Sequence, residues 1–137
     1  MTGKGDAMSK GKKILVVDDD IDCLDQVSML LEGGGFEVVR AQGRADGEEA
    51  LMRVRPDLAV LDLMMEEMDS GFVLCHEVKR LYPGTPVILL TAVASETGMD
   101  FKSSAGDAQS WVKADMILDK PVRPEQLDAA VRRLLAG

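Results

Sequence analysis

The sequence predicts an α/β domain built on a doubly wound, five-stranded parallel sheet. Three observations lead to this fold class: five short apolar runs have the length of buried strands, segments with helical spacing separate most of them, and the runs end at polar residues. Strands that alternate with helices form right-handed βαβ units, whose parallel sheet is covered by helices on both faces as a three-layer sandwich. A chain of 137 residues has the usual size of one such domain.

The expected strands follow one another as short apolar runs. The first, third and fourth runs are continuous, which is typical of strands buried on both faces of a sheet. The second run is expected to form a shorter strand. In chain order, the expected strands are residues 14–17, 36–40, 58–61, 86–90 and 116–118.

The expected helices have apolar residues at intervals of three and four. The glycines at 33–35 end the first helix, and Pro56 ends the second. In the second helix the apolar positions expected to face inward are Ala45, Ala50, Leu51 and Val54. In chain order, the expected helices are residues 21–32, 44–55, 71–81 and 123–135.

Composition and charge narrow the function classes. The formal net charge is −8, and a field of that sign repels phosphate backbones, so we expect no direct contact with nucleic acid. No apolar run approaches the ~20 residues of a membrane span, and the beginning of the chain is not apolar like a secretory signal. Two cysteines form no disulfide framework, which favours a reducing, cytoplasmic location. Residues 1–12 lack periodicity and predict a flexible tail before a domain at 13–137.

Chemically useful side chains follow four of the five strands. Because the carboxyl ends of parallel strands meet at one edge of a sheet, we expect these side chains to converge. Several carboxylates at one place need a cation, and all-oxygen ligands suit Mg²⁺. A carboxylate can also act as a nucleophile, while a hydroxyl and an ammonium can contact phosphoryl oxygens. The residues, in strand order, are Asp18, Asp19, Asp20, Asp62, Thr91 and Lys120.

With these residues the sequence resembles the response-regulator receiver domains of two-component signalling. The resemblance covers about residues 13–136 and is carried by the segments ILVVDDD, LDLMMEEMDSG, PVILLTA and LDKPV. It implies a flavodoxin-like (βα)5 fold. It further implies the following roles: Asp62 accepts the phosphoryl group, Thr91 and Lys120 contact that group, and Mg²⁺ is held by Asp18, Asp19, Asp62 and the backbone carbonyl of Met64.

The same resemblance implies the partners and the extent of the chemistry. The phosphoryl donor is expected to be a phosphohistidine on a sensor histidine kinase or a histidine phosphotransfer protein, and a conformational change then signals to a downstream protein. The chain is expected to be no enzyme beyond its own phosphorylation and slow autodephosphorylation. The slow loss is expected because Met64 and Val93, which flank the approach of water, cannot orient it by hydrogen bonds.

Three alternatives share parts of the pattern. A receiver-like scaffold that works without phosphorylation would keep the fold, although it would typically have lost one of the acids, the Thr or the Lys. A haloacid-dehalogenase-type phosphatase would use Asp18, Asp20, Thr91 and Lys120, but the residues after Lys120 contain no strand-end acid pair. A flavodoxin-like cofactor binder would place its FMN phosphate against three acids, which would oppose it.

Overall fold

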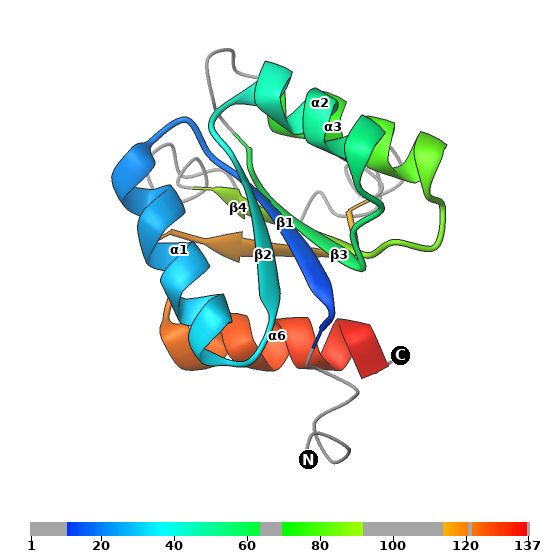
Figure 1. The fold of residues 1–137 in the computed structure, drawn as a ribbon. Helices are drawn as coiled ribbons and strands as arrows, with labels where there is room; N and C mark the ends of the chain where they lie inside the picture. Colours follow the sequence, from blue (N-terminus) through cyan, green and yellow to red (C-terminus); the bar gives the residue numbers. More distant parts are fainter. Residues whose placement is uncertain (1–10, 64–69, 92–113, 121, 137) are drawn as a thin grey trace, which may run out of the picture.

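Five parallel strands form one sheet, as the sequence predicts, and the sheet has the order β2-β1-β3-β4-β5 (Figure 1). The computed structural model of the chain describes residues 11–63, 70–91, 114–120 and 122–136. Each neighbouring pair of strands is parallel and in continuous register, for example Leu15 with Ala59 and Leu61 with Leu89. The strands are β1 Lys13–Val17, β2 Glu37–Ala41, β3 Leu58–Asp62, β4 Val87–Thr91 and β5 Met116–Asp119.

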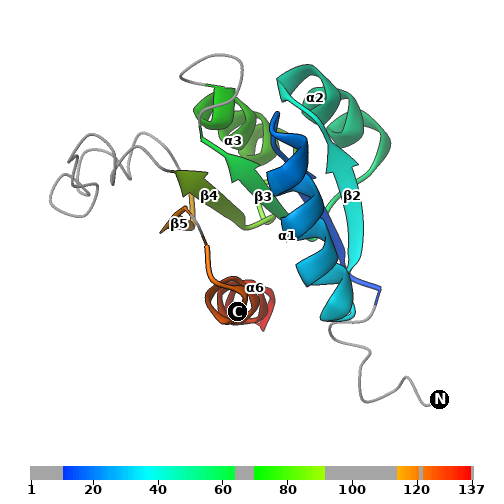
Figure 2. The same ribbon diagram turned by 90° about the vertical axis from the view of Figure 1, so that its left-hand side faces the viewer.

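The described helices cover both faces of the sheet (Figures 1 and 2). Side chains alternate across a strand, so Ile14 and Val16 enter one core and Leu15 and Val17 enter the other. The first core lies under α1 and α6, and the second lies under α2 and α3. These helices are α1 Ile21–Gly33, α2 Arg44–Arg53, α3 Ser70–Leu81 and α6 Pro124–Ala136.

Element ends differ from the sequence-based boundaries in ways that have local causes. Helix α2 ends at Arg53 because Val54 is extended, two residues before Pro56. The prediction that Ala45 faces inward is wrong, since this residue is exposed. The buried position is Gly47 instead: a Cβ there would lie 3.1 Å from Leu74 Cδ1 of α3 and 3.2 Å from Val17 Cγ2 of β1, so the absence of a side chain lets α2 lie close to both.

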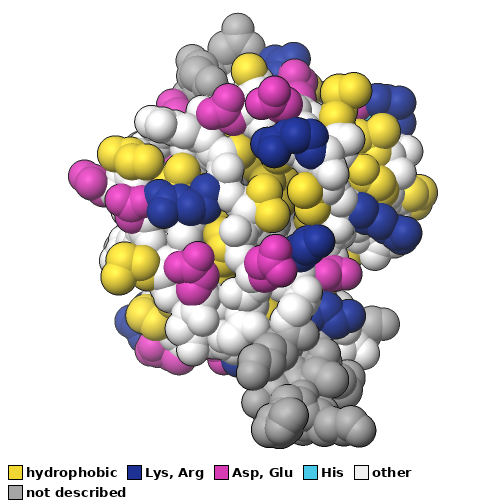
Figure 3. All heavy atoms as spheres, in the orientation of Figure 1, with side chains coloured by type: hydrophobic (Ala, Val, Ile, Leu, Met, Phe, Trp, Pro, Cys, Tyr) yellow, Lys and Arg dark blue, Asp and Glu magenta, His cyan; other side chains and the backbone are white. Residues whose placement is uncertain are grey.

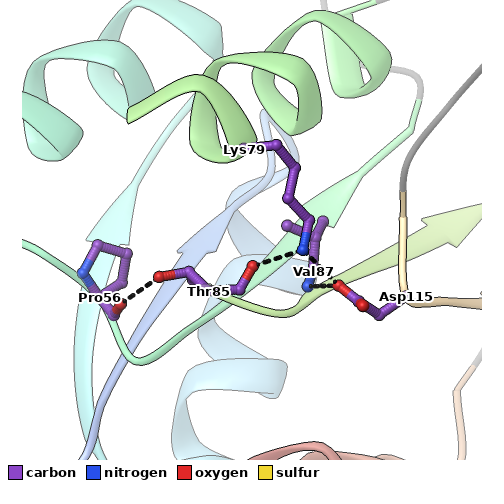
Figure 4. A network of polar contacts seen from close by, with 5 residues as sticks. All are labelled: Pro56, Lys79, Thr85, Val87 and Asp115. Atoms are coloured by element: carbon purple, nitrogen blue, oxygen red, sulfur yellow. Dashed lines mark hydrogen bonds and ion pairs between the residues drawn. The ribbon is translucent and has the colours of Figure 1, made fainter. Parts of the chain in front are cut away.

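Polar contacts bind the amino-terminal ends of β4 and β5 to α3 (Figure 4). Lys79 Nζ donates to the Thr85 carbonyl oxygen and to Asp115 Oδ2, both at 2.8 Å. Asp115 Oδ2 also accepts from the Val87 backbone N at 2.8 Å, and Thr85 Oγ1 donates to the Pro56 carbonyl at 3.0 Å. This network fixes the edge of the sheet opposite the one where the polar strand-end residues gather.

The surface around α1, β2 and α2 mixes acidic, basic and apolar side chains. On the face shown in Figure 3, Asp and Glu side chains lie between Lys, Arg and apolar ones. Arg40 pairs with Asp25, and Arg44 pairs with Glu48 one helical turn away. Among the described residues, no helix combines the length and the apolar character that crossing a membrane would need.

Candidate functional site

The predicted strand-end residues lie at the carboxyl edge of the sheet. From β1 the chain continues to β2 on one side of β1 in the sheet, and it then crosses over to β3 on the other side of β1. The direction of winding therefore changes between β1 and β3. In open α/β sheets this switch point is where ligands bind. Asp18 follows β1 and Asp62 ends β3, so the two acids lie on either side of the switch point.

Three carboxylates converge there. One oxygen from each of Asp18, Asp19 and Asp62 lies within 4.8 Å of the others. Asp18 is 2% exposed and Asp62 is 6% exposed, whereas Asp19 is open to solvent. This all-oxygen donor set, buried on one side and open on the other, fits a hard divalent cation that keeps some of its water.

Lys120 joins the acids from the far end of the chain. Its Nζ lies 3.1 Å from Asp18 Oδ2 and 3.1 Å from Asp62 Oδ1, although 102 residues separate it from Asp18. Its backbone N donates to the carbonyl of Thr91 at 2.9 Å, which continues the pairing of β4 with β5 beyond Asp119. Thr91 itself is buried as the last residue of β4. The strand ladder therefore holds the lysine over the two buried carboxylates.

Burial and charge shift the ionisation of this group. Burial raises the pKa of Asp62 to about 6; the Lys120 ammonium opposes that shift, and the neighbouring Asp18 carboxylate adds to it. Burial alone would lower the pKa of Lys120, but the charges of Asp62 and Asp18 outweigh it and hold the pKa above its usual range. The lysine therefore stays charged near neutral pH, and Asp62 remains a comparatively basic carboxylate.

Asp18 and Asp20 have different local tasks. Asp18 Oδ1 accepts from the Asp20 backbone N at 2.9 Å, which leaves Oδ2 facing Lys120. The exposed Asp20 caps α1, since its Oδ1 accepts from the Asp22 backbone N at 3.0 Å. Asp20 is not one of the three converging acids. The phosphatase alternative needs the side-chain carboxylates of Asp18 and Asp20 at one site. Among the described residues, these two carboxylates do not converge.

Helix α3 begins directly against the backbone that carries Asp62. A Cβ at Gly71 would lie 2.4 Å from Leu63 Cα and 2.5 Å from the Asp62 carbonyl oxygen, so no side chain fits there. The Gly71 backbone N donates to the Leu63 carbonyl at 2.9 Å. The sequence predicts only that a helix begins at this glycine, because the close approach of its backbone to Asp62 depends on the three-dimensional fold.

Four further residues bear on the site: two lie outside the described part of the chain, and two lie near the acids. Met64 and Val93 lie outside the described residues, and so do residues 1–10 of the expected tail. Cys23, a small and partly buried side chain, packs against the core under α1. Burial and the nearby Asp18 raise the pKa of its thiol to about 12. Gln42, which no motif indicated, contacts the backbone of Asp19.

The fold and the site together define a class of α/β domain whose buried aspartate fits the role of a phosphoacceptor. Residues 14–132 match the response regulator receiver domain family, and the chain belongs to that family. It is a receiver domain of two-component signalling, as the sequence predicts, and the scaffold, phosphatase and cofactor-binding alternatives are not favoured.

Similar proteins support this assignment. The chain is 38% identical over 131 residues to a probable transcriptional regulator, ycf27, of Cyanophora paradoxa, covering 90% of this chain and 48% of that protein. It thus spans about half the length of that relative. A CheY-like receiver domain of Methanospirillum hungatei is similar in structure, with 28% identity, a TM-score of 0.78 and coverage of 93% and 95% of the two chains. The response regulator TrrA of Thermotoga maritima, solved in complex with Mg²⁺ and BeF, has 27% identity, a TM-score of 0.74 and coverage of 90% and 98%.

Proposed function

We propose that Asp62 is the phosphoacceptor and that it takes its phosphoryl group from a phosphohistidine. The observation that carries the proposal is the position of Lys120, whose Nζ lies 3.1 Å from both Asp18 and Asp62 at the switch point. A cation placed beside a buried carboxylate can also neutralise the oxygens of a group attached to that carboxylate. The donor is a sensor histidine kinase or a histidine phosphotransfer protein, as the family membership suggests.

The transfer is a displacement at phosphorus. A carboxylate oxygen of Asp62 supplies the electron pair for the new O–P bond, while the bond between phosphorus and the imidazole nitrogen of the donor breaks and the electron pair leaves with the nitrogen. Lys120 and the hydroxyl of Thr91 contact the non-bridging oxygens. Positioning and charge are the main contributions in such transfers. The chain's own chemistry is limited to this phosphorylation and to slow autodephosphorylation.

We propose Mg²⁺ as the cofactor. Asp18, Asp19 and Asp62 would hold it, with the backbone carbonyl of Met64, and the donor set described above fits that ion. When bound, the ion neutralises negative charge on the phosphoryl oxygens and the acids. Structural similarity to a response regulator solved with Mg²⁺ and BeF supports this choice.

The wider setting follows from the same proposal. We propose that the receiver domain occupies residues 13–137 and that the protein acts in the cytoplasm. We propose that it signals to a downstream protein without direct contact with nucleic acid, in keeping with the net charge of −8. The similar ycf27 is named a probable transcriptional regulator, but the chain spans only about half of that protein. Its name therefore does not identify the downstream partner of this chain.

The decisive experiment is phosphorylation by a small donor. The protein is incubated with Mg²⁺ and acetyl phosphate, and the intact mass is compared for the parent, Asp62→Asn and the control Asp119→Asn, which alters an exposed acid at the end of β5. We expect one added phosphoryl group on the parent and the control and none on Asp62→Asn. Phosphorylation of Asp62→Asn would show that another residue is the acceptor. An unmodified parent would support the scaffold alternative instead.

A further inference from the structure

The end of β2 and the loop that follows it contact the backbone of the acidic segment at one point each. The Asp18 backbone N donates to the Ala41 carbonyl oxygen at 3.2 Å, and Gln42 Nε2 donates to the Asp19 carbonyl oxygen at 3.4 Å. Gly43, which follows at once, has a φ of +101°, a conformation that favours glycine and turns the chain into α2. The geometry of this loop thus places the Gln42 amide against the peptide of Asp19.

Asp19 differs from the other two acids in its surroundings. Asp18 and Asp62 are buried, and each lies 3.1 Å from Lys120. Asp19 is exposed, lies beyond the end of β1 and precedes the cap of α1, so neither a strand nor a helix contains it. A hydrogen bond to its carbonyl oxygen restricts the rotation of the peptide that directs its side chain toward the other two acids.

We infer that Gln42 is a positioning residue for Asp19 and strengthens the binding of a divalent cation by the three acids. The inference rests on the proposed Mg²⁺ site. A ligand that is held in its binding orientation before the ion arrives loses less conformational freedom on binding. Residues that orient metal ligands are known to affect metal affinity, although they do not touch the ion. Because Gln42 is exposed and its bond is long, we expect a moderate effect.

The test measures cation binding directly. Mn²⁺, which has the same preference for oxygen ligands, is titrated into the protein, and free Mn²⁺ is followed by electron paramagnetic resonance. Gln42→Met keeps the length of the side chain and removes the N–H donor without adding charge. Gln126→Met is the matched control, since Gln126 is an exposed glutamine on α6. The thermal midpoint of each metal-free variant is measured alongside.

We expect Gln42→Met to bind Mn²⁺ about 2- to 5-fold more weakly than the parent, with an unchanged thermal midpoint, because one neutral hydrogen bond is lost. Gln126→Met is expected to bind like the parent. The inference is wrong if Gln42→Met binds Mn²⁺ like the parent. It is also wrong if the weaker binding is accompanied by a lower thermal midpoint, because the loss would then reflect a less stable fold.

A further variant separates this inference from the proposed site. Asp62→Asn should lose most of the Mn²⁺ affinity. If it does so while Gln42→Met binds normally, only the role of Gln42 fails. If the parent does not bind, or if Asp62→Asn binds as the parent does, the proposed metal site fails and the inference falls with it.

Discussion

Ser28 and Thr85 both carry buried hydroxyl groups, but the two groups differ in their partners. Ser28 on α1 is 1% exposed, and its hydroxyl has no hydrogen-bond partner among the described residues. A buried polar group without a partner destabilises the fold, and serine is also a poorer helix former than alanine. We therefore expect Ser28→Ala to raise the free energy of unfolding by about 1 kcal/mol, as measured by urea denaturation.

Thr85 provides the opposite case. Its hydroxyl, 4% exposed, donates to the Pro56 carbonyl at 3.0 Å. Thr85→Val keeps the shape but leaves that buried carbonyl without this donor, so we expect it to lower the free energy of unfolding by about 1–2 kcal/mol. A loss of stability in Ser28→Ala similar to that in Thr85→Val would mean that Ser28 has a partner in solution.

The two cysteines allow a test of burial at single residues. Cys75 on α3 is fully buried, and burial raises the pKa of its thiol to about 11, while that of Cys23 is raised to about 12. Thiol reagents react with the thiolate, which is scarce at pH 8 for both residues. We expect iodoacetamide to leave Cys75 unlabelled and to label Cys23 slowly in the folded protein, and to label both rapidly in denaturant. Fast labelling of Cys75 in the folded protein would contradict the described packing of α3.

At the scale of elements, one arginine fastens α6 to the turn between α1 and β2. Arg132 Nη2 donates to the Gly34 carbonyl at 2.9 Å, and its guanidinium lies 5.1 Å from the centre of the Phe36 ring. Its Nε also bonds to both carboxylate oxygens of Asp128, at 3.1 and 3.0 Å. We expect Arg132→Ala to lower the free energy of unfolding by about 1–2 kcal/mol, because a hydrogen bond and a cation–π contact are lost together.

The neighbouring Arg133 serves as the matched control. It lies in the same helix turn and is exposed. Arg133→Ala is expected to change the free energy of unfolding by less than about 0.5 kcal/mol. Arg132→Lys, which keeps the charge but loses the planar fork, should fall between the two alanine variants. Equal effects of both alanine substitutions would attribute the stabilisation to charge alone.

The existence of these elements could be predicted from the sequence more reliably than their contacts. Apolar runs such as residues 58–61 indicate buried strands because only a two-sided core accepts them. The prediction failed at Ala45, which is exposed although its spacing in the helix suggested an inward position. The pattern of α2 fits more than one buried face, and the close approach of Gly47 to Leu74 shows which face is buried. The hydrogen bonds of Asp115 with Lys79 and Val87 left no signal at all, since a lone aspartate has many possible partners.

At the scale of the whole molecule, the strand order explains why the acidic site could be predicted. Parallel strands end at one edge, so Asp18 and Asp62 come together whatever lies between them in sequence. The detailed roles were less predictable, because they depend on local backbone geometry. The sequence could not show that Asp20 would cap α1 while Asp19 joins the other acids, or that Gln42 would reach the Asp19 carbonyl.

The convergence of acids has a cost for the metal-free fold. Burial raises the pKa of Asp62 to about 6, so its ionised form is disfavoured even beside Lys120. Asp62→Asn removes this charge, while Lys120 keeps Asp18 at 3.1 Å. In EDTA at pH 7 we expect the variant to be about 1–2 kcal/mol more stable than the parent. In the parent, the free energy of unfolding falls as the pH rises from about 4 through 6, because the unfolded chain releases the Asp62 proton at a lower pH than the folded protein does. The difference in stability between Asp62→Asn and the parent should therefore shrink at pH 4. The control Asp119→Asn, in an exposed acid, should show no such gain.

Added Mg²⁺ should reverse the order of these stabilities. A cation that binds the folded protein and not the unfolded chain stabilises it by an amount that grows with its concentration, about 2.7 kcal/mol at 100 times the dissociation constant. The parent has three carboxylates within 4.8 Å to hold the ion, whereas Asp62→Asn has two. We therefore expect the thermal midpoint of the parent to rise steadily with Mg²⁺ and to overtake that of Asp62→Asn, which should change little. Equal shifts in both proteins would place the cation elsewhere on this acidic chain. No shift in the parent would contradict the proposed metal site at these three acids.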